Sequence, residues 1–164
     1  MQNMTDYRNI NIEELAHELT YHRYLLSQSQ ARGLIRELSI PQYIALQYVS
    51  RAAQCGDDGR VYLRHVAREL RLSIPQASRM VGGLRDKGLV TWSHDGDGSE
   101  GTYLSVTPAG LALLERQDAR LREFYGRVAD RFGRENMARL LEQLVRLEQV
   151  MDGELTQEGA DANE

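Results

Sequence analysis

Residues 63–90, LRHVARELRLSIPQASRMVGGLRDKGLV, decide the fold of this chain. Apolar residues recur at three- and four-residue steps on both sides of Ser73, which predicts two short helices joined by a tight turn. Between residues 60 and 91 there are seven Lys or Arg and two Asp or Glu, a net charge of +5 in a chain whose total charge is −4. A basic helix-turn-helix in an acidic protein is typical of an element that binds DNA.

The second of these helices, which we call the reading helix, is predicted from about residue 74 to residue 87. Ser73 and Gln76 match a capping box, in which each residue satisfies a backbone N–H of the other. Pro75 falls in the first turn, where its missing N–H costs little. Gly88 is placed to end the helix, because glycine readily adopts the left-handed conformation found just past a helix.

A β-hairpin is predicted directly after the reading helix. The β-rich runs 89–93 and 102–106 flank DGDGSEG, whose glycines and acids predict a long connecting tip. A helix-turn-helix followed at once by a two-stranded hairpin is the winged-helix arrangement. We therefore predict a mainly α fold with a small β-hairpin wing.

Helical spacing predicts the remaining elements. Asn11 with Glu14 suggests a capped start for a helix over 11–36, and Pro41 suits the first turn of a second helix. CGDDGR at 55–60 is predicted to be a loop. The expected order is helix, helix, short strand (61–62), helix (64–70), reading helix, hairpin, helix (108–132), helix (135–152).

Composition excludes several classes of protein. No apolar run approaches the roughly 18 residues needed to cross a membrane, and the first residues lack the apolar core of a signal peptide, so a cytoplasmic protein without a membrane partner is expected. A single cysteine, Cys55, excludes an internal disulfide and a Cys-rich zinc site. No nucleophile elbow, phosphate loop or HExxH motif occurs, so we expect no enzyme, no cofactor and no metal.

The segment LRLSIPQASRMVGGLRDKGLV, followed by the hairpin and by LSVTPAGLALLE, resembles the MarR family of bacterial transcription regulators. In that family a similar helix leads through the wing into a TPAG motif. The resemblance implies a homodimer whose first and last helices interlock, and whose two reading helices enter successive major grooves of a pseudo-palindromic DNA operator. It also implies a repressor that releases DNA when a small, often aromatic or phenolic, effector binds.

We divide the chain accordingly. The apolar stripes of the terminal helices exceed what a compact reading head can cover, which independently favours dimerisation through them. The expected regions are an N-terminal dimerisation helix (1–40), a winged helix-turn-helix (41–107), C-terminal dimerisation helices (108–153) and an acidic flexible tail (154–164).

Candidate DNA contacts follow from position on the reading helix. Residues near its start point into the groove, so Gln76, Ser78 and Arg79 are candidates for base edges. Gln76 has a competing role as the capping partner of Ser73, and Arg79 has the alternative of a solvated or intramolecular ion pair. The candidates for phosphate contact or positioning are Arg64, Arg68, Ser73 and Lys87.

Two features depart from the family pattern. The predicted wing tip, residues 95–100, carries three acids and no base, so DNA phosphates would repel it. Gly82 and Gly83 lie inside the reading helix, where each glycine costs about 1 kcal/mol relative to alanine. Either the helix is loosened there or another segment approaches it closely.

The effector pocket is assigned to aromatic and histidine side chains of the first two helices. His17, Tyr21, Tyr24 and Tyr43 are the candidates for an amphipathic pocket. The alternative is that they are ordinary core and interface aromatics. The function expected from the sequence is a ligand-responsive repressor, and the alternative is a winged-helix protein-interaction module without operator binding.

Overall fold

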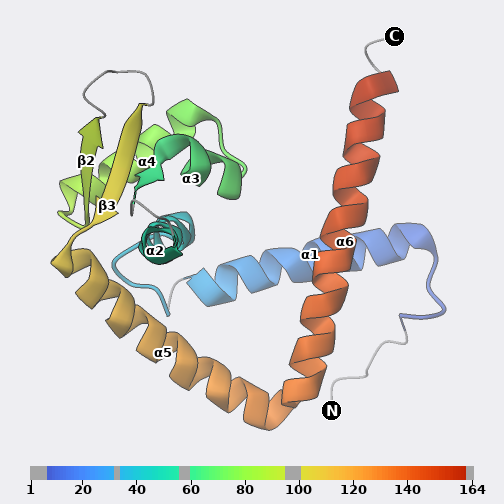
Figure 1. The fold of residues 1–164 in the computed structure, drawn as a ribbon. Helices are drawn as coiled ribbons and strands as arrows, with labels where there is room; N and C mark the ends of the chain where they lie inside the picture. The colour runs from blue at the N-terminus through green and yellow to red at the C-terminus, as the bar shows by residue number, and fades with distance from the viewer. Residues whose placement is uncertain (1–6, 32–33, 56–59, 95–100, 162–164) are drawn as a thin grey trace. The chain divides into compact units, whose positions relative to one another are not determined.

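The computed structural model describes residues 7–31, 34–55, 60–94 and 101–161. Its element order confirms the predicted winged helix-turn-helix (Figure 1). The elements are α1 (Ile12–Ala31), α2 (Ile40–Cys55), β1 (Val61–Tyr62), α3 (Leu63–Glu69), α4 (Ile74–Asp86), β2 (Val90–His94), β3 (Thr102–Val106), α5 (Pro108–Phe132) and α6 (Arg134–Asp161).

The winged region packs α2, α3 and α4 beside a three-stranded antiparallel sheet of order β1-β3-β2 (Figure 1). β3 lies in the middle and pairs Leu104 with both Val61 and Trp92. Leu104 is fully buried, because its side chain meets the helical core. That core is formed by buried aliphatic residues of all three helices: Leu46, Val49, Val66, Ala77, Val81 and Leu84.

The same pentapeptide, LSIPQ, begins α2 at residues 38–42 and α4 at residues 72–76. Each copy forms a capping box. The Gln42 N–H donates to Ser39 Oγ (3.3 Å) and the Ser39 N–H to Gln42 Oε1 (3.2 Å). The corresponding distances between Gln76 and Ser73 are 3.4 and 2.9 Å. The capping box predicted at Ser73 is confirmed, and the earlier copy was missed although the repeat is visible in the sequence.

The turn between α3 and α4 is closed by a Schellman arrangement. The N–H of Leu72 donates to the carbonyl of Ala67 (2.8 Å), and the N–H of Arg71 to that of Arg68 (3.1 Å). Arg71 takes a φ of 52°, in the left-handed region that glycine usually occupies at this position. The tight turn of the helix-turn-helix is therefore set by backbone hydrogen bonds despite the lack of a glycine.

Two predicted helix ends are wrong. α1 ends at Ala31, not at residue 36, and residues 34–39 are not helical. The predicted span placed Gly33 inside the helix, where glycine is unfavourable. α6 continues to Asp161, so residues 154–161 of the predicted flexible tail are helical. One interior glycine, Gly153, does not end a helix whose next residues are mostly good helix formers.

The first helix begins at a capped residue. Asn11 caps α1 as predicted, accepting the N–H of Glu14 at 2.9 Å. Residues 119–164 form a separate compact unit that contains α6. None of the described helices combines the length and apolar character needed to cross a membrane.

Both α1 and α6 expose apolar side chains. They include Ile12, Leu15, Leu19 and Leu26 on α1 and Leu140, Leu141, Leu144, Val150 and Leu155 on α6.

Candidate nucleic-acid interface

α4 has one buried face and one exposed face. Ala77, Val81 and Leu84 are buried at helical spacing and form the face turned toward the core. Arg79 lies on the opposite face with an exposed side chain, and Ser78 is half-buried. Within the described ranges no hydrogen bond or ion pair holds Arg79. Its guanidinium is therefore available for an external acceptor.

The side chain of Gln76 is engaged by its capping role. Its Oε1 accepts from the backbone N–H and from the hydroxyl of Ser73, both at 2.9 Å. Bidentate pairing with adenine requires the oxygen and the nitrogen of the amide together. In the capped conformation Gln76 offers only its amide nitrogen outward, so its predicted base contact is confined to a single hydrogen bond or requires the cap to open.

Lys87 ties the end of α4 to the segment before α2. Its Nζ donates to the carbonyl of Glu37 at 2.7 Å and to Gln42 Oε1 at 3.5 Å. A side chain held in this way positions the reading helix. Phosphate contact by Lys87, the other predicted role, stays a prediction.

The two glycines inside α4 have different surroundings. A Cβ on Gly83 would lie 2.9 Å from Gln42 Nε2, whereas a Cβ on Gly82 would meet no atom within 4 Å. Of the two expectations for this pair, close approach by another segment therefore applies to Gly83. Gly82 remains an interior glycine without a packing reason.

The TPAG motif joins the end of α4 to the start of α5, a geometry that sequence reasoning did not foresee. Thr107 donates its hydroxyl to the carbonyl of Gly88 (2.7 Å) and its N–H to that of Leu89 (3.0 Å). The same hydroxyl accepts the N–H of Gly110 at 3.0 Å, which caps α5. A Cβ on Gly110 would overlap the carbonyl oxygen of Leu89 and lie 2.7 Å from Val106 Cγ1. We call this joint the TPAG clasp.

The predicted phosphate contacts on α3 are exposed. Arg64 and Arg68 lie one helical turn apart and both side chains are exposed. The Arg64 guanidinium carbon lies 4.5 Å from the centre of the Tyr62 ring. Arg85 is paired with Asp86 (3.1 Å) and stacked on Trp92 (4.9 Å), so its charge is partly neutralised. The wing tip, residues 95–100, and loop residues 56–59 lie outside the described residues.

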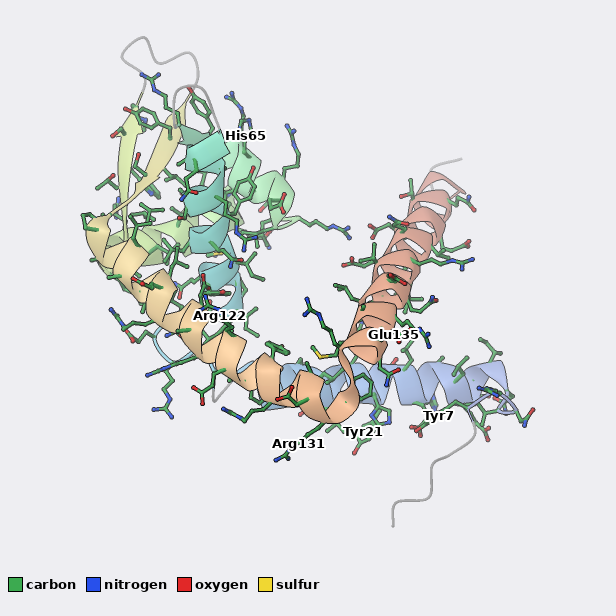
Figure 2. All side chains as sticks on the ribbon, turned by 60° about the horizontal axis from the view of Figure 1, so that its bottom comes forward. Tyr7, Tyr21, His65, Arg122, Arg131 and Glu135 are labelled. Carbon is green, nitrogen blue, oxygen red and sulfur yellow. The ribbon has the colours of Figure 1, made fainter. Side chains whose placement is uncertain are left out.

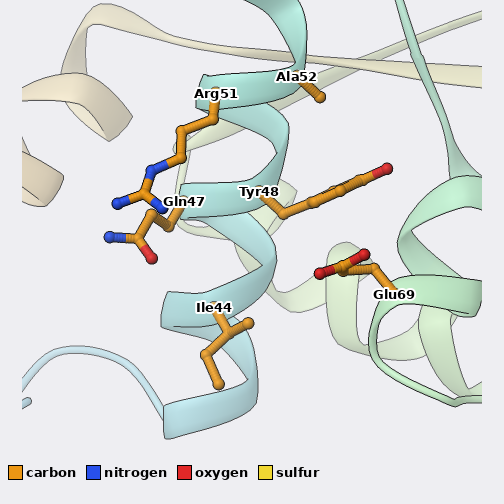
Figure 3. A pocket seen from close by; sticks show the side chains of 6 residues that line it. All are labelled: Ile44, Gln47, Tyr48, Arg51, Ala52 and Glu69. Carbon is orange, nitrogen blue, oxygen red and sulfur yellow. The ribbon is translucent and has the colours of Figure 1, made fainter. Parts of the chain in front are cut away.

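A pocket of about 310 Å³ opens on the side of α2 and reaches Glu69 of α3 (Figure 3). Apolar carbons dominate the lining, which also includes the polar groups of four residues. Arg51 and Gln47 project from one side of α2, and Tyr48 projects from the other side toward Glu69 (Figure 3). The complete lining is Ile44, Gln47, Tyr48, Arg51, Ala52 and Glu69.

Tyr43 anchors the pocket wall to α5. Its hydroxyl donates to Asp118 Oδ1 at 2.5 Å and accepts from Gln47 Nε2 at 3.1 Å. Burial, followed by the bond to Asp118, raises the pKa of Tyr43 to about 12. None of the four predicted effector residues lines this pocket: Tyr43 bonds to Gln47 of the lining, and the side chains of His17, Tyr21 and Tyr24 are exposed on α1 (Tyr21 is labelled in Figure 2).

Comparison with solved structures places the chain among known folds. A probable transcriptional regulator from Pseudomonas aeruginosa is 21% identical, with a TM-score of 0.67 over 82% of this chain and 97% of that one. A mutant MarR from E. coli complexed with operator DNA is 16% identical, with a TM-score of 0.68 over 84% and 99%. The PcaV transcriptional regulator from Streptomyces coelicolor, in complex with its natural ligand, is 19% identical, with a TM-score of 0.63 over 85% and 92%.

No protein-family model and no curated protein sequence matches the chain. The structural likeness therefore shows the fold. It is the fold of the MarR-type regulators, which confirms both the predicted winged-helix class and, at the level of the fold, the resemblance seen in the sequence.

Proposed function

We propose that this chain is a DNA-binding transcriptional regulator of the MarR family, which binds a pseudo-palindromic operator as a homodimer. The exposed face of α4 carries the proposal. That face presents Arg79 with no partner among the described residues, at a helix held in place by a capping box and by the TPAG clasp. A structure of the same fold is that of a MarR complexed with operator DNA, which supports DNA binding as the function of this fold.

A mobility-shift assay tests the proposal. The probe is the DNA that flanks the chain's own gene, and the competitor is random-sequence duplex across a range of salt concentrations. We expect a sequence-preferring shift that weakens with salt, with a slope of about −0.9 for each phosphate contact. A shift without sequence preference at low salt would favour the alternative, a winged-helix module that binds a protein partner.

Replacing Arg79 tests which face of α4 contacts bases. Arg79→Ala is expected to lower operator affinity by about 1–3 kcal/mol and to relax preference at one base pair. Arg127→Ala is the matched control, because Arg127 is an equally charged, exposed residue paired with Glu123 on α5. An equal loss on operator and random duplex would make Arg79 a phosphate contact instead.

The exposed apolar faces of α1 and α6 support the proposed homodimer. Leu144 is 48% exposed and Leu155 64% exposed, and apolar stripes of this kind mark interaction surfaces. Sedimentation equilibrium is expected to give twice the chain mass. Leu140→Arg with Leu144→Arg is expected to give a monomer, because a guanidinium cannot be buried unpaired in an interface. A dimer that survives both changes would place the interface elsewhere.

The pocket on α2 is the proposed effector site. Arg51 and Gln47 offer N–H donors on one side, and Ile44 and Tyr48 offer apolar surface, a combination that suits a small aromatic acid. Isothermal titration with benzoate-type probes is expected to show binding that Arg51→Ala abolishes. Binding that depends instead on His17, Tyr21 or Tyr24 would contradict this assignment and place the effector site at the residues predicted from the sequence.

A further inference from the structure

We infer that the pocket on α2 selects a zwitterionic aromatic ligand, with an anionic group at one end and a cationic group at the other. This inference rests on the proposed effector site, and it adds a cationic end to the aromatic acid proposed there. The anionic end is assigned to Arg51, and the cationic end is assigned to Glu69 and to the ring of Tyr48.

The pocket contains one charged side chain of each sign, and neither is neutralised. Arg51 lines it from α2, and Glu69 lines it from the end of α3. Neither side chain forms a hydrogen bond or an ion pair with any residue of the ranges that the structure describes. Both charges are therefore available to one occupant of about 310 Å³ of space.

The two charges lie on different sides of the pocket. Figure 3 shows Arg51 beside Gln47 on one side of α2, whereas Glu69 lies on the side toward which Tyr48 projects. The apolar side chains of Ile44 and Ala52 belong to the same lining. A ligand that reaches both charges therefore needs an apolar body between its own two charged groups.

Glu69 projects from a backbone that is fixed by hydrogen bonds and burial. It is the last residue of α3, and it directly follows two core positions, Val66 and Ala67, and the exposed Arg68. The carbonyl of Val66 accepts the N–H of Leu70 at 3.1 Å, and the carbonyl of Ala67 closes the turn before α4. Little backbone ordering is therefore needed when a ligand binds, which favours affinity for a small molecule.

Charge complementarity favours a zwitterion over a simple acid or a simple amine. A carboxylate bound at Arg51 is repelled by Glu69 when the ligand carries no cation, and an amine bound at Glu69 is repelled by Arg51 in the same way. A zwitterion turns both repulsions into attractions. The ring of Tyr48 adds to the attraction for the cationic end, because the face of an aromatic ring attracts cations.

Isothermal titration of the full-length chain near pH 7 tests the inference with four probes. Para-(aminomethyl)benzoate carries its charges at opposite ends of a ring, and benzoate and benzylamine each carry one of those charges. Phenylglycine is an isomer of the first probe with both charges on one carbon. We expect para-(aminomethyl)benzoate to bind about tenfold more tightly than any of the other three.

Replacing Glu69 identifies the cationic subsite. Glu69→Gln keeps the shape of the side chain and removes its charge, so it is expected to weaken para-(aminomethyl)benzoate about tenfold without weakening benzoate. Glu115→Gln is the matched control, because Glu115 is an exposed acid on α5 that does not belong to the lining, and it is expected to leave all affinities unchanged. Thermal unfolding confirms that each variant is folded.

The outcomes separate this inference from the proposed effector site. Equal affinity for benzoate and para-(aminomethyl)benzoate, tighter binding of phenylglycine, or an undiminished affinity in Glu69→Gln overturns the zwitterion inference alone, provided that benzoate still binds. Absence of binding by all four probes overturns the proposed effector site, and the inference with it.

Discussion

The pentapeptide LSIPQ starts α2 and α4 with the same capping box, but the two copies have different surroundings. In the first copy Leu38 is buried, and Gln42 Oε1 also accepts from Lys87. At the matching positions of the second copy Leu72 is only half-buried and Gln76 is exposed, and Ile74 is 50% exposed where Ile40 is half-buried. Identical residues therefore form a packed joint in one place and a solvent-facing helix start in the other.

The residues that follow each copy account for the difference. Tyr43 comes directly after the first copy and anchors α2 to Asp118, whereas Ala77 occupies the same place in α4 and only fills the core. The pentapeptide specifies where a helix begins, and the next turn specifies which face is buried. A sequence signal for the start of a helix therefore does not predict whether that helix start is packed or exposed.

The largest loss of folding stability is expected from a substitution at the joint that follows the C-terminal end of α4. The TPAG clasp fixes that end. Gly110→Ala forces a methyl group against the backbone of Leu89, which cannot yield as a flexible side chain would, and is expected to destabilise the chain by about 3 kcal/mol. Urea unfolding measures this loss. Gly126→Ala, at a position with no atom within 4 Å of the new Cβ, is the control and is expected to be neutral or stabilising.

Replacing the capping serine of each LSIPQ copy by alanine tests the comparison of the two copies directly. Ser39→Ala and Ser73→Ala are each expected to cost about 1 kcal/mol, since both serines accept a backbone N–H at a helix start. The comparison predicts that only Ser73→Ala also weakens DNA binding, measured by anisotropy. Equal losses of DNA affinity would mean that the first copy acts on DNA as well, through the position of α4.

Alanine substitutions at the two glycines of α4 test how closely the first LSIPQ copy packs against this helix. Gly82→Ala is expected to stabilise the chain by about 0.5–1 kcal/mol, because the new methyl group meets nothing. Gly83→Ala is expected to lose this gain, because Gln42 must move away from its bonds to Ser39 and Lys87. Urea midpoints of the two variants give the difference, and equal stabilisation would show that Gln42 moves aside without cost.

Tyr43 gives a stability that depends on pH. Its folded pKa of about 12 lies above the ordinary value of 10, so the folded chain keeps a proton that the unfolded chain loses. The stabilisation is therefore complete below about pH 10 and is lost as the pH rises from 10 to 12. The difference in phenolate absorbance between wild type and Tyr43→Phe is expected to titrate near 12, and a midpoint near 10 would contradict the buried bond to Asp118.

The helix pattern was largely predictable, because apolar spacing, the Ser73 capping box, Pro75 and Gly88 all act locally. Errors arose where local signals were weak, at Gly33 and Gly153. The candidate site was less predictable. The bonds of Lys87 to Glu37 and the stacking of Arg64 on Tyr62 link residues whose contact depends on tertiary packing and strand register.

The pocket shows the same limit. Its lining includes Gln47, Arg51 and Glu69, none of which was a predicted effector residue, and the effector role of His17, Tyr21, Tyr24 and Tyr43 stays a prediction. The spacing of the lining residues in the sequence gives no sign that α2 and α3 enclose a shared space. Chemical type alone favoured tyrosine and histidine, whereas the packing of two helices determined the lining.

The TPAG clasp also has a mechanical consequence. The two carbonyls just after α4, those of Gly88 and Leu89, accept hydrogen bonds from Thr107. The first turn of α5 and the winged region are therefore expected to rotate as one body. α4 has 13 residues, which makes it a lever arm of about 20 Å from the clasp to Ser73. Over such an arm a rotation of about 10° at the clasp moves the tip of the reading helix by about 3 Å, the length of a hydrogen bond. A small turn of α5 is therefore enough to move the tip of α4 by the length of a hydrogen bond, which would break a base contact of the kind proposed for Arg79.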